Sequence, residues 1–483
     1  MAVTSMGRRD FMKYAAAAAA ALATTGRLLA AEAGGGGAGG PGKARPNIIL
    51  FLSDDHGYED SGCYGDKVVR TPNIDKLAAE SMLFTQAYAG SPLCVPSRCV
   101  IQSGRMPFSN GAHAFGTGIK EDVKLLPDYF REMGYYTAHV GKWHHGDAKQ
   151  PEYDYKNGSD RKALEVLADK TRTKPLMMVI CSHQPHLPWA KNEGYDPAKV
   201  KLPANFVDTP ETRKCRCEYY TDISQMDAFL GEVVKAIKDS GIEDDTLLIY
   251  TSDQGANWPF AKWCVYVAGL RVPFLARWPG HIKPGSTTDA MISFCDILPT
   301  FIQAAGGSAP TGIDGRGFLD VLTGKADKFR DCVFGSHTGY RGKDIPGVNN
   351  HSPARTIITR QYQYILNLDS SRPFDTHITG CKPKSQYYVA FWDSWVEKAK
   401  TDPAAKAIVD AYRHRPVEEL YDLAADPLER NNLANDPKLT KAKQDLRARL
   451  DEWRKQQGDD VPLILPDGKQ DAVTRRRGPY DAT

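Results

Sequence analysis

Residues 94–105 read CVPSRCVIQSGR and bring two cysteines, two serines and two arginines into one short stretch. If a helix begins near Cys94, Pro96 lies in its first turn, and Arg98 lies one turn after Cys94 on the same face. Helix N-termini attract anions, and a cysteine placed there has a lowered pKa. Cys94 is therefore a candidate thiolate nucleophile, although the sequence assigns it no histidine partner of a Cys-His dyad.

The other cysteines exclude two simpler explanations of Cys94. Ten cysteines in 483 residues are too sparse for a disulfide framework. Cys94 and Cys99 are five apart, Cys215 and Cys217 form a C-x-C pair, and neither pair has the spacing of a structural zinc site.

Apolar runs at 47–52, 135–140, 176–181, 246–250 and 272–278 alternate with helical stretches. Such runs are typical of parallel strands buried on both faces, so the expected fold class is α/β. Four of the runs lead directly into polar segments that read SDDHG, GKWHH, SHQPH and TSDQG. Because ligands of open α/β sheets bind at the carboxyl ends of the strands, these segments are expected to converge on one site.

Two kinds of chemistry are available at those strand ends. Asp54, Asp55, Asp253 and Gln254 offer an oxygen-only ligand set, which suits a hard cation such as Ca²⁺ or Mg²⁺. Lys142 and His144 are two positions apart and face the same side of an extended segment, where they could hold an anion. The alternative is that these segments are ordinary turns, helix caps and strand ends, which use the same residue types.

The organisation of the chain follows from composition. The net charge is +3 and acidic and basic residues are interspersed, which excludes a basic domain built for nucleic acid. Paired Arg8 and Arg9 before an alanine run, with AAEA at 30–33, predict a twin-arginine export signal over 1–33 and transport by the twin-arginine translocase. The run is too short to span a membrane, so a periplasmic or secreted protein without stable membrane insertion is expected. A Gly-rich linker covers 34–45.

Several motifs together resemble one family, the formylglycine-dependent type I sulfatases. C-x-P-S-R at 94–98 and S-G-R at 103–105 match its signature, with Ser103 where the family has threonine. NIILFLSDDHG, GKWHHG, SHQPHLPW and ELYDLAADPLERNNLA are also similar, so the resemblance spans about Arg45 to Leu433. It implies an alkaline phosphatase-like α/β fold with a mostly parallel central sheet flanked by helices. A catalytic domain over 46–330, a C-terminal α+β subdomain over 331–460 and a tail over 461–483 are expected.

The resemblance also implies a chemistry for Cys94. A formylglycine-generating maturase would convert it to an aldehyde, whose hydrate carries two hydroxyl groups. One hydroxyl attacks sulfur and displaces the sugar oxygen or nitrogen; the other then loses its proton, expels sulfate and restores the aldehyde. A bare thiol would instead leave a stable thiosulfate ester. Cysteine is in this view the precursor of the nucleophile.

Further roles carry over by position. One Ca²⁺ ion would be held by Asp54, Asp55, Asp253, Gln254 and residue 94. Gln254 stands where the family more often has asparagine or histidine, which keeps the amide oxygen but moves it by one methylene. Arg98, Lys142 and His144 would hold the hydrate. Lys262 would bind the sulfate, and His183 would protonate the leaving group as general acid.

The substrate expected from this resemblance is a sulfated saccharide. SDQGANWPFAK, with its Trp-Pro-Phe and Lys262, looks like the heparan N-sulfatase (N-sulfoglucosamine sulfohydrolase) branch. Three alternatives stay open: an O-sulfate or aryl sulfate ester sulfatase, a phosphatase or phosphodiesterase, and a non-catalytic sulfoglycan-binding protein. The second alternative normally uses serine or threonine with two metals, which C-x-P-S-R does not match.

Other residues could contact the sugar. Tryptophan side chains can stack on a sugar ring, but they more often pack in a core; this applies to Trp143, Trp189, Trp258 and Trp263. Possible contacts from the C-terminal region are His337, His351 and Arg355.

Overall fold

The computed structural model describes residues 45–114, 116–146, 148–339, 352–381, 383, 385 and 388–468. The expected export signal, all but the last residue of the linker, His351 and residues 469–483 of the expected tail lie outside these ranges. The domain limits near 330 and 460 stay predictions. No helix in the described ranges is both long enough and apolar enough to cross a membrane.

An eight-stranded sheet forms the centre of the fold, in the order β5-β4-β6-β1-β7-β8-β2-β9. The first five strands run parallel, β8 is antiparallel to both β7 and β2, and β9 is parallel to β2. The α/β prediction is confirmed, and each of the five apolar runs forms a strand. The strands are β1 (Asn47–Ser53), β2 (Met82–Phe84), β4 (Tyr136–Gly141), β5 (Tyr155–Asn157), β6 (Leu176–Cys181), β7 (Thr246–Ser252), β8 (Phe274–Arg277) and β9 (Ser286–Thr288).

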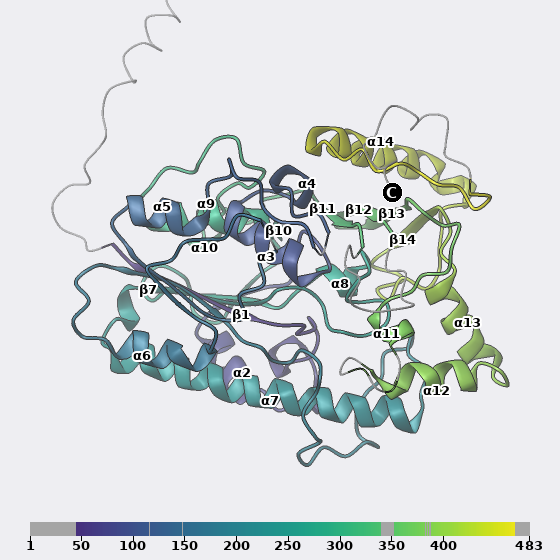
Figure 1. Ribbon diagram of the computed structural model, residues 1–483, viewed down its shortest axis with the longest axis horizontal. Helices are drawn as coiled ribbons and strands as arrows, with labels where there is room; N and C mark the ends of the chain where they lie inside the picture. The colour runs from purple at the N-terminus through teal and green to yellow at the C-terminus, as the bar shows by residue number, and fades with distance from the viewer. Residues whose placement is uncertain are drawn as a thin grey trace, which may run out of the picture. The chain divides into compact units, whose positions relative to one another are not determined.

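Helices cover both faces of this sheet (Figure 1). Ile49 and Phe51 of β1 pack in one core with α2, α6 and α7, whereas Ile48, Leu50 and Leu52 pack in a second core with α3, α5 and α9. Both faces of β1 are therefore buried, which explains its unbroken apolar sequence. The helices of these layers are α2 (Pro72–Ala79), α3 (Cys94–Ser103), α4 (Pro107–Asn110), α5 (Leu126–Glu132), α6 (Ala163–Ala168), α7 (Pro210–Asp239), α8 (Val267–Leu270), α9 (Ile297–Ala304) and α10 (Leu319–Leu322).

The C-terminal region forms a second, antiparallel sheet in the order β11-β12-β13-β14, and α14 lies over it (Figure 1). A short parallel pair, β3 (Ala87–Tyr88) and β10 (Ile292–Ser293), stands apart from both sheets. The elements of the region are β11 (Cys332–His337), β12 (Ala354–Thr359), β13 (Tyr362–Asn367), β14 (Glu418–Asp422), α11 (His377–Gly380), α12 (Ala390–Lys398), α13 (Pro403–Arg413) and α14 (Thr440–Gln457).

The register of the parallel strands aligns their carboxyl ends at one edge of the sheet. Ser53 at the end of β1 pairs with Ser252 at the end of β7, and Cys181 at the end of β6 pairs with both Leu52 and Gly141. The polar segments that follow these four strands therefore begin side by side at one edge of the sheet.

Candidate functional site

Backbone hydrogen bonds hold the four strand-end segments together. The N–H of Asp54 donates to the carbonyl of Gln184 at 3.1 Å, and the N–H of Asp253 donates to Ser53 at 3.0 Å. The N–H of Lys142 donates to Cys181 at 2.9 Å. The convergence expected from the sequence is thus present in the backbone.

The helix α3 brings the cysteine motif to the same place. Cys94 is its first residue, Pro96 lies in the first turn as expected, and every residue of the helix is buried. The hydroxyl of Ser97 donates to the carbonyl of Asp253. Arg98 binds the Asp253 carboxylate through Nε at 3.0 Å and Nη2 at 2.8 Å, and its Nη2 lies 3.5 Å from Asp54 Oδ1. The helix that begins at Cys94 is therefore bound directly to two of the metal-ligand candidates.

Two lysines complete the cluster of charges. Lys142 Nζ lies 2.5 Å from Asp54 Oδ2, and Lys262 Nζ lies 2.7 Å from Asp55 Oδ2. Burial raises the pKa of Asp54, but Lys142 and other nearby cations lower it well below its usual value, so this carboxylate is ionised. A negative charge at Cys94 would raise the pKa of each of the three cations, Arg98, Lys142 and Lys262. An anion bound next to Cys94 would meet all three.

The acidic side of the cluster fits a hard divalent cation. In the described part of the chain, Asp54 Oδ1 and Gln254 Oε1 are buried acceptors without a hydrogen-bond partner. Burial raises the pKa of Asp253 well above its usual value; Arg98 opposes this, and the charges of Asp54 and Asp55 add to it. A bound cation would satisfy the free acceptors and relieve the crowding of carboxylates. The oxygens of Asp54, Asp55, Asp253 and Gln254 are hard ligands of the kind that Ca²⁺ prefers.

Two histidines lie close to this cluster. Burial, together with the charges of Lys142 and Arg98, lowers the pKa of His144 to about 3, so its ring is neutral at ordinary pH. His186 Nε2 lies 3.8 Å from Asp55 Oδ2, and ligand atoms of Asp54, Asp55 and His186 all fall within 4.8 Å of one another. Sequence reasoning missed His186; the signal was the second histidine of SHQPH, three positions after His183.

The expected general acid is placed differently. His183 is 54% exposed and faces Asp160, with Nδ1 3.9 Å from Asp160 Oδ2. It follows β6 by two residues, between Ser182, whose N–H donates to Leu52 at 2.9 Å, and Gln184, which accepts from Asp54. Its backbone is thus fixed beside the cluster while its ring stays accessible to solvent, as a group that meets a substrate must be.

The tryptophans mainly pack. Trp258 is 2% exposed and stacks on Trp189 with ring centroids 4.9 Å apart, and Phe391 lies 4.8 Å away on the C-terminal side. Trp263 is also buried, edge-on to His377 at 4.6 Å. Trp143 packs against two buried histidines. Stacking of Trp258 on a sugar is therefore wrong, because its ring is enclosed by other aromatic rings.

This burial leads to a stability prediction. Replacing Trp258 with alanine should lower the free energy of unfolding by about 3–5 kcal/mol, since it removes a large buried aromatic side chain and leaves a cavity. Urea unfolding followed by circular dichroism measures the loss. A variant as stable as the wild type that only binds saccharide more weakly would contradict the core position of Trp258.

Two C-terminal candidates are also structural. Arg355 is fully buried, and its Nε lies 2.6 Å from Asp459 Oδ2 while its Nη1 donates to the carbonyl of His337 at 2.5 Å. His337 itself is 2% exposed. The guanidinium of Arg355 thus joins β12 to the segment after α14 and is not available to a sugar.

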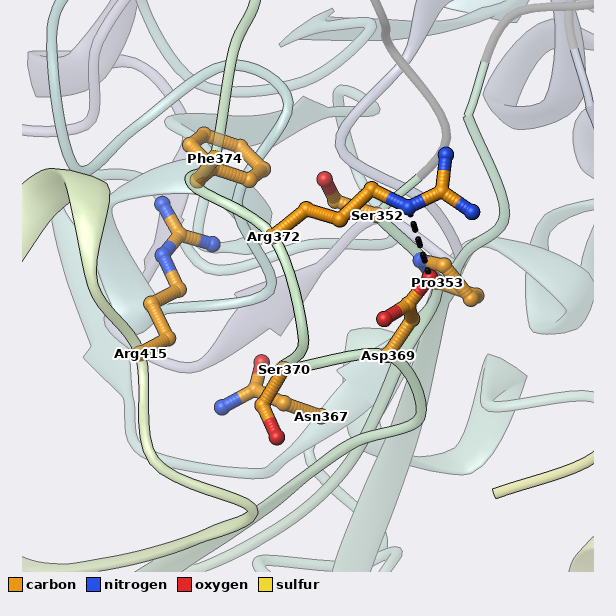
Figure 2. A pocket seen from close by; sticks show the side chains of 8 residues that line it. All are labelled: Ser352, Pro353, Asn367, Asp369, Ser370, Arg372, Phe374 and Arg415. Atoms are coloured by element: carbon orange, nitrogen blue, oxygen red, sulfur yellow. Dashed lines mark ion pairs between the residues drawn. The ribbon is translucent and has the colours of Figure 1, made fainter. Parts of the chain in front are cut away.

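A small polar hollow lies in the C-terminal region (Figure 2). Arg372 reaches across it toward Asp369, with Nε 3.8 Å from Oδ2. Among the described residues, Asp369 Oδ2 and Ser370 Oγ have no hydrogen-bond partner. The hollow has room for about one water molecule, which would satisfy both. Its walls are formed by Ser352, Pro353, Asn367, Asp369, Ser370, Arg372, Phe374 and Arg415.

Comparison with protein families gives two matches. The sulfatase family model matches residues 46–308, which contain every site candidate described above apart from the C-terminal ones. A second model, described as the C-terminal part of N-sulphoglucosamine sulphohydrolase, matches residues 255–377.

Individual relatives agree. An ulvan-active sulfatase of Formosa agariphila is 34% identical over 458 residues, covering 90% of this chain and 87% of the relative. Human N-sulphoglucosamine sulphohydrolase is 28% identical, covering 88% and 93%. A solved structure bound to its substrate D-glucosamine-2-N,6-O-disulfate aligns with a TM-score of 0.64 at 21% identity, covering 86% of this chain and 99% of that chain. This last likeness concerns the fold.

Proposed function

Because this chain belongs to the sulfatase family, we propose that it removes sulfate groups from sulfated saccharides and that Cys94 is the precursor of its formylglycine nucleophile. The observation that carries the proposal is the setting of Cys94. It begins a buried helix whose Arg98 pairs with Asp253 and Asp54, in a cluster where Lys142 and Lys262 pair with Asp54 and Asp55. Sulfate is an anion, and the sulfate oxygens gain negative charge when the nucleophile of a sulfatase attacks sulfur, so nearby cations stabilise the transition state.

The side chains divide the work. Lys262 binds a sulfate oxygen and Lys142 holds the hydrate of residue 94, and their ion pairs with Asp55 and Asp54 fix both lysines before substrate arrives. Arg98, held by Asp253, orients the hydrate of residue 94. A Ca²⁺ ion held by Asp54, Asp55, Asp253 and Gln254 would, when bound, draw electron density from the sulfate oxygens.

The bonds change in two stages. A hydroxyl of the residue 94 hydrate attacks sulfur, and the bond from sulfur to the sugar oxygen or nitrogen breaks. His183 gives the leaving group its proton. The remaining hydroxyl then loses its proton to His144, which the family resemblance places at the hydrate, and the bond from the residue 94 carbon to the sulfate oxygen breaks. Sulfate leaves and the aldehyde is restored.

Two substrate classes have support. The match of residues 255–377 to the C-terminal part of N-sulphoglucosamine sulphohydrolase and the human relative favour an N-sulfoglucosamine substrate. The ulvan-active relative, which is more identical to this chain, favours an O-sulfated saccharide as the second candidate. We also propose export through the paired Arg8 and Arg9, and maturation of Cys94 by a formylglycine-generating enzyme.

The two classes make different predictions for a substrate panel. Matured enzyme should release sulfate from glucosamine N-sulfate and leave glucosamine 6-O-sulfate, galactose sulfates and ulvan fragments uncleaved. Ion chromatography of free sulfate measures the release, with the Cys94→Ala variant as the blank. Release from O-sulfates alone would overturn the N-sulfate assignment and keep the sulfatase function. No release from any member would count against the function itself.

A further inference from the structure

The carboxylate that faces His183 comes from a different part of the sheet. Asp160 begins a short 3-10 helix (Asp160–Lys162) after β5, the edge strand next to β4. Its Oδ2 lies 3.9 Å from His183 Nδ1, and its side chain is only 18% exposed. Neither the family signature nor the strand-end motifs include this residue.

Packing holds Asp160 in place. The backbone N–H groups of Arg161 and His183 lie near its carboxylate and favour the ionised form. Gly141, at the end of β4, makes room for this contact: a Cβ there would lie 3.0 Å from the Asp160 Cβ and 1.8 Å from the carbonyl oxygen of Cys181. Asp160 is thus packed against the end of β4, with its carboxylate facing the ring of His183.

Its charge state suits a partner of an imidazole. Burial raises the pKa of Asp160, but the His183 ring and the two backbone N–H groups lower it below its usual value. The carboxylate is therefore ionised at neutral pH. The neighbouring cation does not compete, because Arg161 pairs with Glu232 on the surface, with Nη2 2.5 Å from Oε2.

We propose that Asp160 is the positioning residue of the proton donor His183, holding Nδ1–H so that Nε2 faces the leaving group. The inference rests on the proposed function and deepens it. A doubly protonated ring turned this way donates its Nε2 proton to the departing sugar oxygen or nitrogen. The Nδ1 proton stays on the ring and is donated to the Asp160 carboxylate, so one proton moves and the neutral Nδ1–H tautomer is left. The separation of 3.9 Å exceeds a hydrogen bond, and a small rotation of the ring closes it, as catalytic contacts do when substrate binds.

A double-mutant cycle on the saccharide tests the proposal. Asp160→Asn should lower kcat for saccharide sulfate release by about 10- to 100-fold with little change in KM, the usual cost of losing an outer partner of a functional histidine. His183→Ala should lower kcat by about 100-fold or more. In the His183→Ala background, Asp160→Asn should change kcat by less than about twofold, because its effect passes through the ring.

Two further measurements separate positioning from folding. With 4-nitrophenyl sulfate, whose leaving group needs no proton, Asp160→Asn should retain most of the wild-type rate. The matched control is Glu232→Gln. It removes the carboxylate that pairs with Arg161, the residue next to Asp160, and should leave the rates on the saccharide and on 4-nitrophenyl sulfate unchanged.

The outcomes are distinct. Additive losses in the double mutant, or wild-type saccharide turnover in Asp160→Asn, overturn the proposal while the proposed function stands. Equal losses on both substrates with a lowered unfolding midpoint show a purely structural Asp160 and also overturn it. A wild-type enzyme that releases sulfate from no saccharide removes the proposed function and this inference together.

Discussion

Replacing Cys94 with alanine is expected to abolish sulfate release, with a loss of at least about 1000-fold in kcat, as for the loss of a covalent nucleophile. Alanine cannot become an aldehyde, so no hydrate is available to attack sulfur. Cys94 is 3% exposed and starts a helix whose other buried contacts are unaffected, so the variant should fold. Release of sulfate from the best saccharide of the panel and the midpoint of thermal unfolding measure the two properties.

The same residue separates the sulfatase from a mere binder of sulfated glycans. Mass spectrometry of the peptide that contains residue 94 should show the aldehyde in active protein and a plain cysteine in protein made without a maturase. Substantial turnover by Cys94→Ala would rule out Cys94 as the nucleophile precursor. Full activity with an unmodified thiol would keep Cys94 and rule out formylglycine. Binding without turnover in fully modified protein would favour the non-catalytic alternative.

The central sheet was predictable because its strands are buried on both faces. Runs such as 48–52 and 176–181 consist of apolar residues without alternation, and parallel strands between two helical layers bury such a run on both faces. The antiparallel insertion of β8 between β7 and β2 was not predictable, because β2 and β9 have only three residues each and carry little pattern.

The site was predictable where it follows strand ends and unpredictable where it depends on partners. The positions of Asp54 and Asp253 follow from two neighbouring parallel strands. The pairing of Lys142 with Asp54 and of Lys262 with Asp55 joins residues far apart in sequence, and no spacing rule specifies it. The same applies to Asp160, which faces His183 only because β5 lies at the edge beside β4. The burial of Trp258 depends on Phe391, which packs on it from the C-terminal region.

Removing the bound cation is expected to have the second large effect. Chelation with EGTA should abolish sulfate release and lower the midpoint of thermal unfolding, and added Ca²⁺ should restore both. The physical reason is that, among the described residues, Asp54 Oδ1 and Gln254 Oε1 are buried acceptors without a hydrogen-bond partner. Burial, to which the charges of Asp54 and Asp55 add, also raises the pKa of Asp253 next to them. At about 100 times its dissociation constant, Ca²⁺ stabilises the folded protein by about 2.7 kcal/mol.

The Asp55→Asn variant should lose this response, because it removes a ligand charge and leaves Lys262 without its buried partner. Asp60→Asn is the matched control: Asp60 is also a buried carboxylate, paired with Arg216 and with the hydroxyl of Tyr219 at 3.1 Å, but it lies outside the cluster. It should lower the unfolding midpoint and keep the full Ca²⁺ response. Two results would contradict the prediction. One is a wild-type unfolding midpoint that changes with neither EGTA nor Ca²⁺; the other is a Ca²⁺ response that is lost in Asp60→Asn and kept in Asp55→Asn. Either would show that the acidic cluster is held by its lysines and Arg98 without a cation.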